Sequence, residues 1–322
     1  MARLLTQIEN DTPSGRAALA ELFRHTGRAH LIGVTGAPGT GKSSLVNQLA
    51  RFYRQTGSGA ARPKVAIIAV DPSSPFSGGA ILGDRVRMRD LAGDAGVFIR
   101  SMAARGSLGG LSAATAGAVQ AFDAAGYEMI LIETVGAGQA EVDIARLAHT
   151  TLVIEAPGLG DDIQAIKAGI LEIADILVIN KADQPGADNT ERALRNMLEL
   201  AHPVGRAFPE ASRPFASPGQ METAPNIPLW MPLIRRTVAI QSLGIAELAE
   251  AIAAHRQYLQ ESGEWQRRER QRLSSDLETL LHEALIARWR AAVDEEYYRS
   301  VANALLTRQI SPHEAVARLL RG

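Results

Sequence analysis

Residues 31–45 read LIGVTGAPGTGKSSL, and the rest of the chain is organised around this stretch. It opens with an apolar run that suits a buried strand, and it continues with the pattern G-x-x-x-x-G-K-[ST] and a segment of helical spacing. A glycine-rich turn of this kind points backbone N–H groups at phosphate oxygens, and the helix N-terminus adds positive partial charge. We therefore expect a phosphate-binding loop made by Gly36, Ala37, Pro38, Gly39, Thr40, Gly41, Lys42, Ser43 and Ser44.

The charged and hydroxyl groups near this loop predict a hydrolytic site with Mg²⁺. Lys42 is expected to reach the β- and γ-phosphates, and the Ser43 hydroxyl is expected to take one Mg²⁺ position. Asp71 and Glu133 each follow an apolar run, and Asp84 lies in a glycine-rich loop, so all three are candidates for the metal shell. For the two aspartates, ordinary turn chemistry is an open alternative. We expect Lys42, Asp84 and Glu133 to carry the hydrolysis.

A second motif, NKAD at residues 180–183, predicts which base is bound. The Asp183 carboxylate can accept hydrogen bonds from guanine N1–H and the 2-amino group, and adenine offers neither donor in that geometry. Asn180 would brace the loop, and the Lys181 stem would cover the ring. We expect residues 236–240 to form the last strand. The segment Val238, Ala239 and Ile240 is expected to lay backbone N–H groups on the base of GTP or GDP, although the usual serine before the alanine is absent.

The composition excludes several classes of protein. The 322 residues are 46% hydrophobic with a formal net charge of −1, which gives no overall attraction to nucleic acid or to an anionic membrane. No apolar run is long enough to span a membrane, and the first residues do not resemble a secretory signal. The chain has no cysteine, which excludes disulfides and thiolate metal sites and fits a cytoplasmic location.

Lysine is rare in this chain. Of the 34 basic residues four are lysines, Lys42, Lys64, Lys167 and Lys181, and the other 30 are arginines. Where a generic positive charge suffices the chain uses arginine, so a lysine is expected where a compact ammonium is needed. Lys42 and Lys181 fall inside nucleotide motifs, and the same reasoning makes Lys167 a candidate functional residue. Lys64 is interpreted as a solvated residue at the start of a strand.

Six strands that alternate with helices predict an α/β fold with a doubly wound, mostly parallel sheet. We expect an N-terminal helical extension at 1–29, a P-loop GTPase-type domain at 30–260 and a C-terminal helical arm at 261–322. In the arm, the arginine-rich run 265–273 is expected to be a solvated helix face. An apolar stripe follows, which must be buried somewhere, and a second copy of the chain is the expected partner. The stripe comprises Leu273, Leu277, Leu280, Leu281, Ala284, Leu285 and Trp289.

With these motifs in hand, the chain resembles the MeaB/ArgK-type G proteins, a branch of the P-loop GTPases that includes metallochaperones. The strings that carry the resemblance are VTGAPGTGKSSL, VDPSSPFSGGAILGDRVRM, IETVGAGQ, APGLGDDIQAIK and NKAD. The resemblance runs from about residue 3 to the C-terminal SPHEAVARLL, which is nearly the whole chain.

The resemblance implies a function and assigns roles to residues. Such proteins hydrolyse GTP slowly as homodimers, escort adenosylcobalamin-dependent acyl-CoA mutases, most often methylmalonyl-CoA mutase, and gate the loading and exchange of the cofactor. The family's Mg²⁺-shell and switch carboxylates match Asp71, Asp84 and Glu133. A mobile third switch loop that responds to the mutase matches residues 155–167, and its candidate residues are Asp161, Asp162, Gln164 and Lys167.

Three alternatives stay open at this point. A nickel-insertion GTPase would need clustered His or Cys ligands, but the seven histidines are scattered along the sequence. A P-loop kinase for a small molecule would need an acceptor site, and the sequence shows no signature of one. A nucleotide sensor without catalytic turnover would carry the same motifs.

Overall fold

The computed structural model describes residues 1–56, 62–72, 88–91, 93–104, 113–134, 140–158, 172–200 and 229–320. The chain divides into two compact units, Met1–Leu273 and Ser274–Gly322. The larger unit is built on a β-sheet, and the smaller unit is helical.

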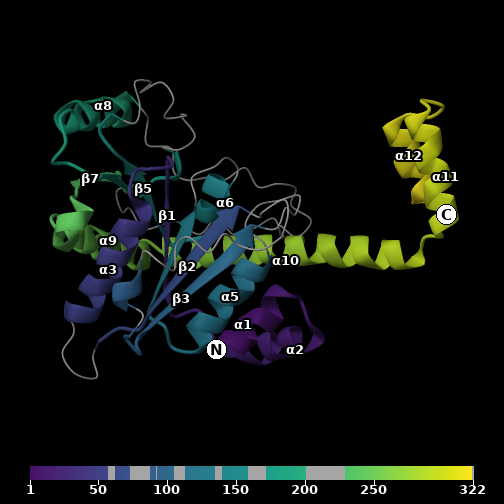
Figure 1. Cartoon of the computed structure of the whole chain (residues 1–322), viewed down its shortest axis with the longest axis horizontal. Helices are drawn as coiled ribbons and strands as arrows, with labels where there is room; N and C mark the ends of the chain where they lie inside the picture. Colours follow the sequence, from purple (N-terminus) through teal and green to yellow (C-terminus); the bar gives the residue numbers. More distant parts are fainter. Residues whose placement is uncertain are drawn as a thin grey trace. The chain divides into compact units, whose positions relative to one another are not determined.

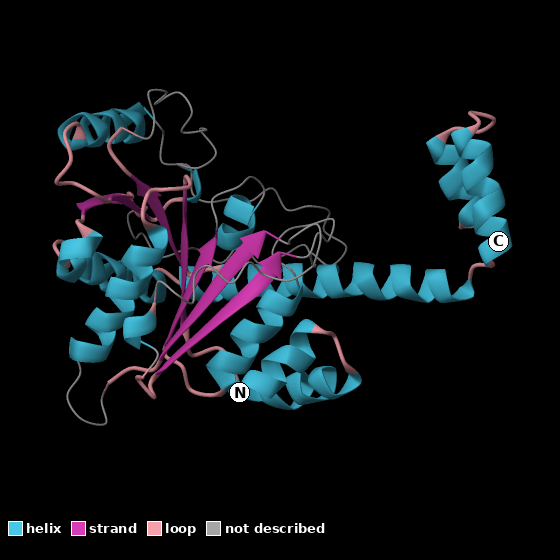
Figure 2. Ribbon diagram, in the orientation of Figure 1, coloured by secondary structure: helices cyan, strands magenta, loops and turns pink. Residues whose placement is uncertain are grey.

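The sheet of the larger unit has seven strands among the described residues, and every neighbouring pair is parallel (Figures 1 and 2). Their order is β3-β2-β4-β1-β5-β6-β7, so β1 lies in the middle with β4 and β5 on either side. The expected doubly wound parallel sheet is confirmed, with seven strands where six were expected. The strands are β1 (His30–Gly36), β2 (Val65–Pro72), β3 (Val97–Ala104), β4 (Met129–Thr134), β5 (Thr150–Glu155), β6 (Ile176–Ile179) and β7 (Leu233–Arg236).

Helices cover both faces of this sheet, because successive strand residues point to opposite faces and both faces are apolar. In β4, Leu131 packs into one core, and its neighbours Ile130 and Ile132 pack into the other. The first core is closed by α3 (Lys42–Thr56) and α9 (Ile245–Glu261). The second is closed by α1 (Ala2–Glu9), α5 (Ala113–Ala124) and α6 (Ala140–Leu147) (Figure 1). A third, smaller core lies between β5, β6 and α8 (Ala187–Leu200).

The N-terminal segment forms two short helices with a turn between Glu9 and Pro13. The second helix, α2 (Pro13–Leu22), begins with proline, and the Thr12 side chain caps it by accepting a hydrogen bond from the Gly15 N–H at 3.1 Å. Leu5 and Ile8 of α1 are buried against α5 and the sheet. This segment is therefore packed on the larger unit.

The last strand is shorter than expected and begins earlier. β7 pairs with β6, which spans only four residues, and the ladder ends where the Thr237 N–H donates to the carbonyl of Ile179 at 2.9 Å. The predicted strand at 236–240 is therefore wrong beyond its first residue. The chain instead turns into the short helix η5 (Ala239–Gln241).

The expected solvated face of the arginine-rich run is also wrong in part. Residues 264–273 form the first turns of α10 (Glu264–Ala292), and Arg272 is buried there. Arg268 pairs with the buried carboxylate of Asp175 at 3.0 Å. Both arginines are withdrawn from solvent because carboxylates pair with them, Asp175 before β6 with Arg268 and Glu269 of α10 with Arg272.

The C-terminal unit comprises the rest of α10 together with α11 (Glu295–Leu306) and α12 (Pro312–Leu319). Its small core is formed by Val301, Ile310 and Ala315. The stripe on α10 is left largely uncovered, since Leu277 is 65% exposed and Leu281 is 52% exposed.

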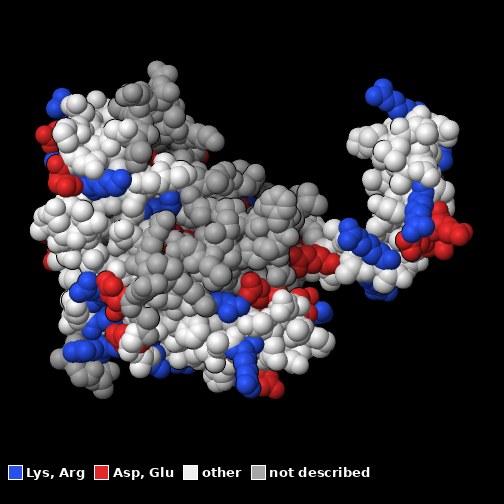
Figure 3. Space-filling view, viewed as in Figure 1, with Lys and Arg blue, Asp and Glu red and all other residues white. Residues whose placement is uncertain are grey.

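Basic and acidic side chains are interspersed over the described part of the face drawn in Figure 3. Among the described residues, none of the helices is both long enough and apolar enough to cross a lipid bilayer.

Candidate functional site

The phosphate-binding loop leaves the carboxyl end of β1 and enters α3 at Lys42. Two of its glycines are required by their surroundings. At Gly36 the backbone φ is +137°, and a Cβ would lie 2.1 Å from the carbonyl oxygen of Ile154 on β5. At Gly41 φ is +90°, and a Cβ would lie 2.4 Å from the side-chain nitrogen of Asn180. A side chain at either position would clash with these atoms, and its backbone would be strained at a positive φ. Glycine at both positions therefore lets the loop pack closely on β5 and Asn180.

Lys42 lies across this loop. Its ammonium donates hydrogen bonds to the carbonyl oxygens of Gly36 at 2.8 Å and Ala37 at 3.0 Å, and the residue is 6% exposed. The hydroxyl of Thr40 also donates to the Ala37 carbonyl, at 2.9 Å. These bonds hold the positive charge at the centre of the loop, where the phosphates of a nucleotide are expected.

Ser43 faces the end of β4. Its hydroxyl donates a hydrogen bond to Glu133 Oε1 at 2.6 Å, and both residues are buried. β4 pairs with β1, and Glu133 stands opposite Val34 in that ladder, so the parallel register brings the carboxylate to the loop. A hydroxyl and a carboxylate are the hard oxygen ligands that suit Mg²⁺, and their convergence here fits the ion predicted from the sequence.

Asn180 joins three segments of the site. Its side-chain nitrogen donates to the carbonyl of Thr40 in the phosphate loop at 2.8 Å. Its side-chain oxygen accepts from the Thr237 hydroxyl and from the Ala239 N–H, each at 3.1 Å. The segment after β7 is thus tied to the phosphate loop through one buried amide. Thr237, which sequence reasoning missed, supplies the hydroxyl contact in a loop that lacks the usual serine.

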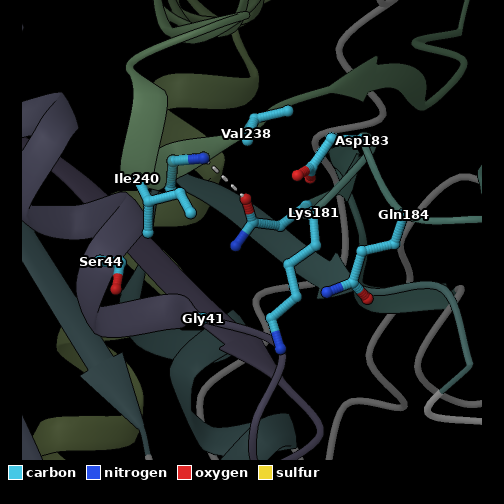
Figure 4. Close-up of a pocket in the computed structure, with 9 residues that line it drawn as sticks. Gly41, Ser44, Lys181, Asp183, Gln184, Val238 and Ile240 are labelled. Carbon is cyan, nitrogen blue, oxygen red and sulfur yellow. Dashed lines mark hydrogen bonds between the residues drawn. The ribbon is translucent and has the colours of Figure 1, made fainter.

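The residues predicted to recognise the base line one pocket together with residues of the phosphate loop (Figure 4). Lys181 has φ +57°, and its side chain extends towards Gly41, while the Asp183 carboxylate lies near Val238. The N–H of Ala182, which lies between Lys181 and Asp183, donates to the Thr237 carbonyl at 3.1 Å and fixes the turn there. The pocket is lined by Gly41, Ser44, Asn180, Lys181, Asp183, Gln184, Val238, Ala239 and Ile240, of which Gln184 was not predicted.

Other predicted site residues cannot be placed from the described part of the chain. The backbone of Asp71 lies in β2 opposite Ala103 of β3, and its side chain is outside the described residues. Asp84 is outside them as well, and so are the candidate switch residues Asp161, Asp162, Gln164 and Lys167.

The chain is similar to known proteins over nearly its whole length. Residues 1–294 match the model of a family described as methylmalonyl-CoA mutase-associated GTPase MeaB. A provisionally named GTPase of Pyrococcus abyssi is 40% identical over 320 residues, which cover 99% of this chain and 91% of that protein. The GTPase ArgK of Escherichia coli is 34% identical over 326 residues, with coverage of 99% and 91%. The crystal structure of a LAO/AO transport system kinase has a TM-score of 0.67 and 27% identity, covering 99% of this chain and 91% of that one.

Proposed function

Because this chain belongs to the MeaB family of GTPases, we propose that it couples GTP hydrolysis to the loading and protection of the cobalamin cofactor of an acyl-CoA mutase. The family is described by its association with methylmalonyl-CoA mutase, and that enzyme is the proposed partner. GTP binding and hydrolysis follow from membership of the family. The chaperone role and the choice of mutase are the proposed part.

One observation carries the nucleotide half of this proposal. The Asn180 amide bonds both to the phosphate loop at Thr40 and to the loop after β7 at Ala239. The phosphate-binding groups and the base-binding groups therefore belong to one connected site. A nucleotide that spans them would contact Lys42 with its phosphates and Asp183 with its base.

The side chains present have separable tasks in hydrolysis. The loop N–H groups and the N-terminus of α3 bind phosphate oxygens, and Lys42 neutralises charge that develops on them. We propose that Ser43 and Glu133 hold Mg²⁺, directly or through water, with Asp71 and Asp84 as further candidates. When bound, the ion would neutralise charge on the phosphate oxygens. Asp183 would select guanine, because its carboxylate accepts from the two donors on that base.

The partner-dependent part of the proposal rests on the segment 155–167, which is mostly outside the described residues. We propose that Asp161, Asp162, Gln164 and Lys167 respond to the docked mutase. Support comes from the family's association with a mutase and from the rarity of lysine in a chain with 30 arginines, since 34 basic residues include four lysines. A contact that exists only in the docked state would change stimulated turnover and leave intrinsic turnover unchanged.

We also propose that the protein acts as a homodimer. The α10 stripe offers apolar side chains at helical spacing that the described C-terminal unit does not cover, including Leu277, Leu280, Leu281 and Leu285 at 52–65% exposure. A second copy presents the same surface, so two stripes can bury each other in a symmetric contact.

The test is GTP turnover with and without methylmalonyl-CoA mutase, followed as release of inorganic phosphate. We expect slow release that rises when the mutase is added, and a smaller rise for Lys167→Ala with the same intrinsic rate. Lys64→Ala, at an exposed position, is the matched control. Equal turnover with and without the mutase would contradict the chaperone role. Transfer of phosphate to a small-molecule acceptor would favour a kinase, the activity in the name of the solved structure with TM-score 0.67.

A further inference from the structure

A second cluster of titratable side chains lies at the amino-terminal edge of the sheet, at the ends of the strands opposite the nucleotide site. It consists of His30 at the start of β1, His149 immediately before β5, and His255 in α9. The three residues are buried, with exposed fractions of 1%, 2% and 0%. None of them lies in a nucleotide motif, and the function proposed above does not use them.

Two of the rings are joined through the Thr150 hydroxyl by hydrogen bonds that match donor to acceptor when both rings are neutral. His30 Nε2 lies 2.7 Å from the Thr150 hydroxyl oxygen, which lies 2.9 Å from His255 Nδ1. His255 Nε2 lies 3.3 Å from the Asp175 carboxylate. When the proton of each neutral ring is on Nε2, His30 donates to the Thr150 hydroxyl, and that hydroxyl donates to His255 Nδ1. The Nε2–H of His255 then faces the Asp175 carboxylate. The two hydrogen bonds of the Thr150 hydroxyl are then matched, one with His30 and one with His255.

The first turns of α10 close over this cluster. The Trp265 ring stacks on His149 with centroids 3.9 Å apart, and its centroid lies 5.8 Å from that of His30. Glu269 Oε1 lies 2.6 Å from His149 Nε2, and the Leu31 N–H donates to His149 Nδ1 at 3.1 Å. Because Nδ1 accepts from a backbone N–H, the single proton of a neutral His149 must be on Nε2, where Glu269 accepts it. A second proton would break the bond to β1.

The charges around His30 oppose its protonation. Burial is the largest cause that lowers the pKa of His30 well below its ordinary value, and His149, Arg256 and His255 lower it further, against the carboxylate of Asp175. Burial also lowers the pKa of His149, despite its hydrogen bond to Glu269.

The charged groups that act on His30 and His149 come from α9, from the residue before β6 and from α10. Arg256 lies on α9, Asp175 precedes β6, and α10 contributes Arg268, Glu269 and Arg272. Burial works to raise the pKa of Glu269, but hydrogen bonds from His149 and Arg272 hold it at about 2. Glu269 therefore stays ionised throughout the range in which histidine titrates.

We propose that His30 and His149 form a proton-operated latch with Trp265, which holds residues 264–273 of α10 on the amino-terminal edge of the sheet while these two rings are neutral and releases them in acid. Trp265 lies against both rings, so we expect them to meet water when it moves away and then to take protons at the ordinary histidine pKa. The docked state is fully favoured above that pKa, and it loses stability as the pH falls towards the lower pKa values of the docked rings.

Hydrogen–deuterium exchange on the full-length protein tests the latch. Exchange at residues 265–273 would be measured at pH 7.5 and 5.5 and corrected for the intrinsic chemical rate at each pH. An undocked histidine has a pKa near 6.5, and a docked ring has a pKa well below that. One such ring lowers the protection of α10 against exchange about tenfold at pH 5.5 relative to pH 7.5. We expect a loss of at least that size at 265–273, with less than a twofold change in α3. Equal corrected protection at the two pH values would overturn the proposal.

The double variant His30→Gln, His149→Gln removes both rings of the latch and keeps side-chain N–H donors. Protection at 265–273 should then no longer depend on pH. His282→Gln replaces an exposed histidine of the C-terminal unit and should behave as the unmodified chain. A double variant that keeps the full pH dependence contradicts the latch.

A measurement on the unmodified chain covers the case in which the double variant does not fold. NMR of ring-labelled histidines should show that His30 and His149 take up protons only below the ordinary histidine range while α10 is protected. Normal titration of His30 and His149 with residues 265–273 still protected would overturn the proposal.

Discussion

Ser43 and Glu133 are joined by a hydrogen bond of 2.6 Å, although 90 residues separate them in the sequence. The serine lies in the first turn of the helix after the loop, and the glutamate lies near the carboxyl end of β4, the strand beside β1. The bond therefore aligns two oxygen groups at the point where the parallel sheet, the loop and the helix meet, which is where a metal ion bound to the phosphates is expected.

Replacing Glu133 with glutamine should lower GTP turnover and leave nucleotide affinity nearly unchanged. The amide oxygen can still accept from Ser43, but the negative charge proposed to act on Mg²⁺ is lost. We expect Mg²⁺-dependent GTP turnover to fall by about tenfold or more, ~1.4 kcal/mol of activation free energy, with GDP affinity nearly unchanged. Turnover is measured as phosphate release and affinity by calorimetry. Glu128→Gln, at an exposed position, is the control, and equal turnover in both variants would remove Glu133 from the metal site.

Replacing Lys42 with alanine should abolish hydrolysis. The change removes the charge that meets the phosphates and also the two hydrogen bonds that the ammonium makes to Gly36 and Ala37. Circular dichroism should show a folded protein, and single-turnover assays should show no phosphate release above background. Lys64→Ala should retain full activity. Substantial hydrolysis by the Lys42→Ala protein would mean that the phosphates lie elsewhere.

Asp183→Asn should weaken the preference for guanine. An amide presents a donor where the carboxylate presents only acceptors, and it faces donors on the base. In the unmodified protein we expect GTP to bind at least about tenfold more tightly than ATP, or ~1.4 kcal/mol, and the variant should lose most of that difference. Competition calorimetry compares the two nucleotides, with Asp11→Asn in the N-terminal turn as control. Equal affinity for GTP and ATP in the unmodified chain would contradict the assignment.

Thr237→Val should destabilise the site without removing any predicted nucleotide contact. The change deletes the hydroxyl that donates to the buried Asn180 oxygen at 3.1 Å, and that oxygen keeps the Ala239 N–H. The free energy of unfolding should fall by about 1 kcal/mol, and GTP affinity should fall with it. Denaturant unfolding and calorimetry measure the two effects. Thr307→Val removes an exposed hydroxyl from α11's end and should leave both values unchanged.

Leu277→Asp combined with Leu281→Asp should yield a monomer. The two charges would lie in the proposed seam between copies, where burial without a partner costs several kcal/mol. Light scattering gives the mass of the unmodified and variant proteins. Phe23→Asp places a charge at an exposed apolar position of the larger unit and should leave the dimer intact. A monomeric unmodified protein, or a dimeric double variant, would show that the stripe serves another purpose.

The nucleotide motifs were predictable because they combine fixed spacing with fixed backbone demands. Gly36 and Gly41 leave no room for a side chain, and NKAD follows a buried strand whose carboxyl end must lie beside the phosphate loop in a parallel sheet. The same reasoning placed Glu133 near Ser43. The strand at 236–240 was predicted too late, because an apolar run does not reveal where its partner strand ends.

The histidine cluster could not be predicted from the sequence. The cluster's members, His30, His149 and His255, are far apart in the sequence. The seven histidines of the chain were therefore interpreted as scattered. The arginine-rich run 265–273 was interpreted as a solvated face, because nothing in the sequence shows that Asp175 pairs with Arg268. Both features depend on the three-dimensional arrangement of β5, β6, α9 and α10. Thr237 was missed for a related reason, because its hydroxyl contributes through Asn180 and not through a motif position.

The scarcity of lysine gives this protein a built-in chemical reporter. Lys181 lines the pocket proposed to hold the base, and Lys42 is buried in the loop proposed to bind phosphate, whereas Lys64 is open to solvent. An amine-reactive reagent followed by mass spectrometry would modify Lys64 whether or not the pocket is filled. The Lys181 side chain would be shielded when a nucleotide covers it. The ratio of Lys181 modification to Lys64 modification therefore measures how much of the pocket is occupied. It needs neither a fluorophore nor a substituted residue.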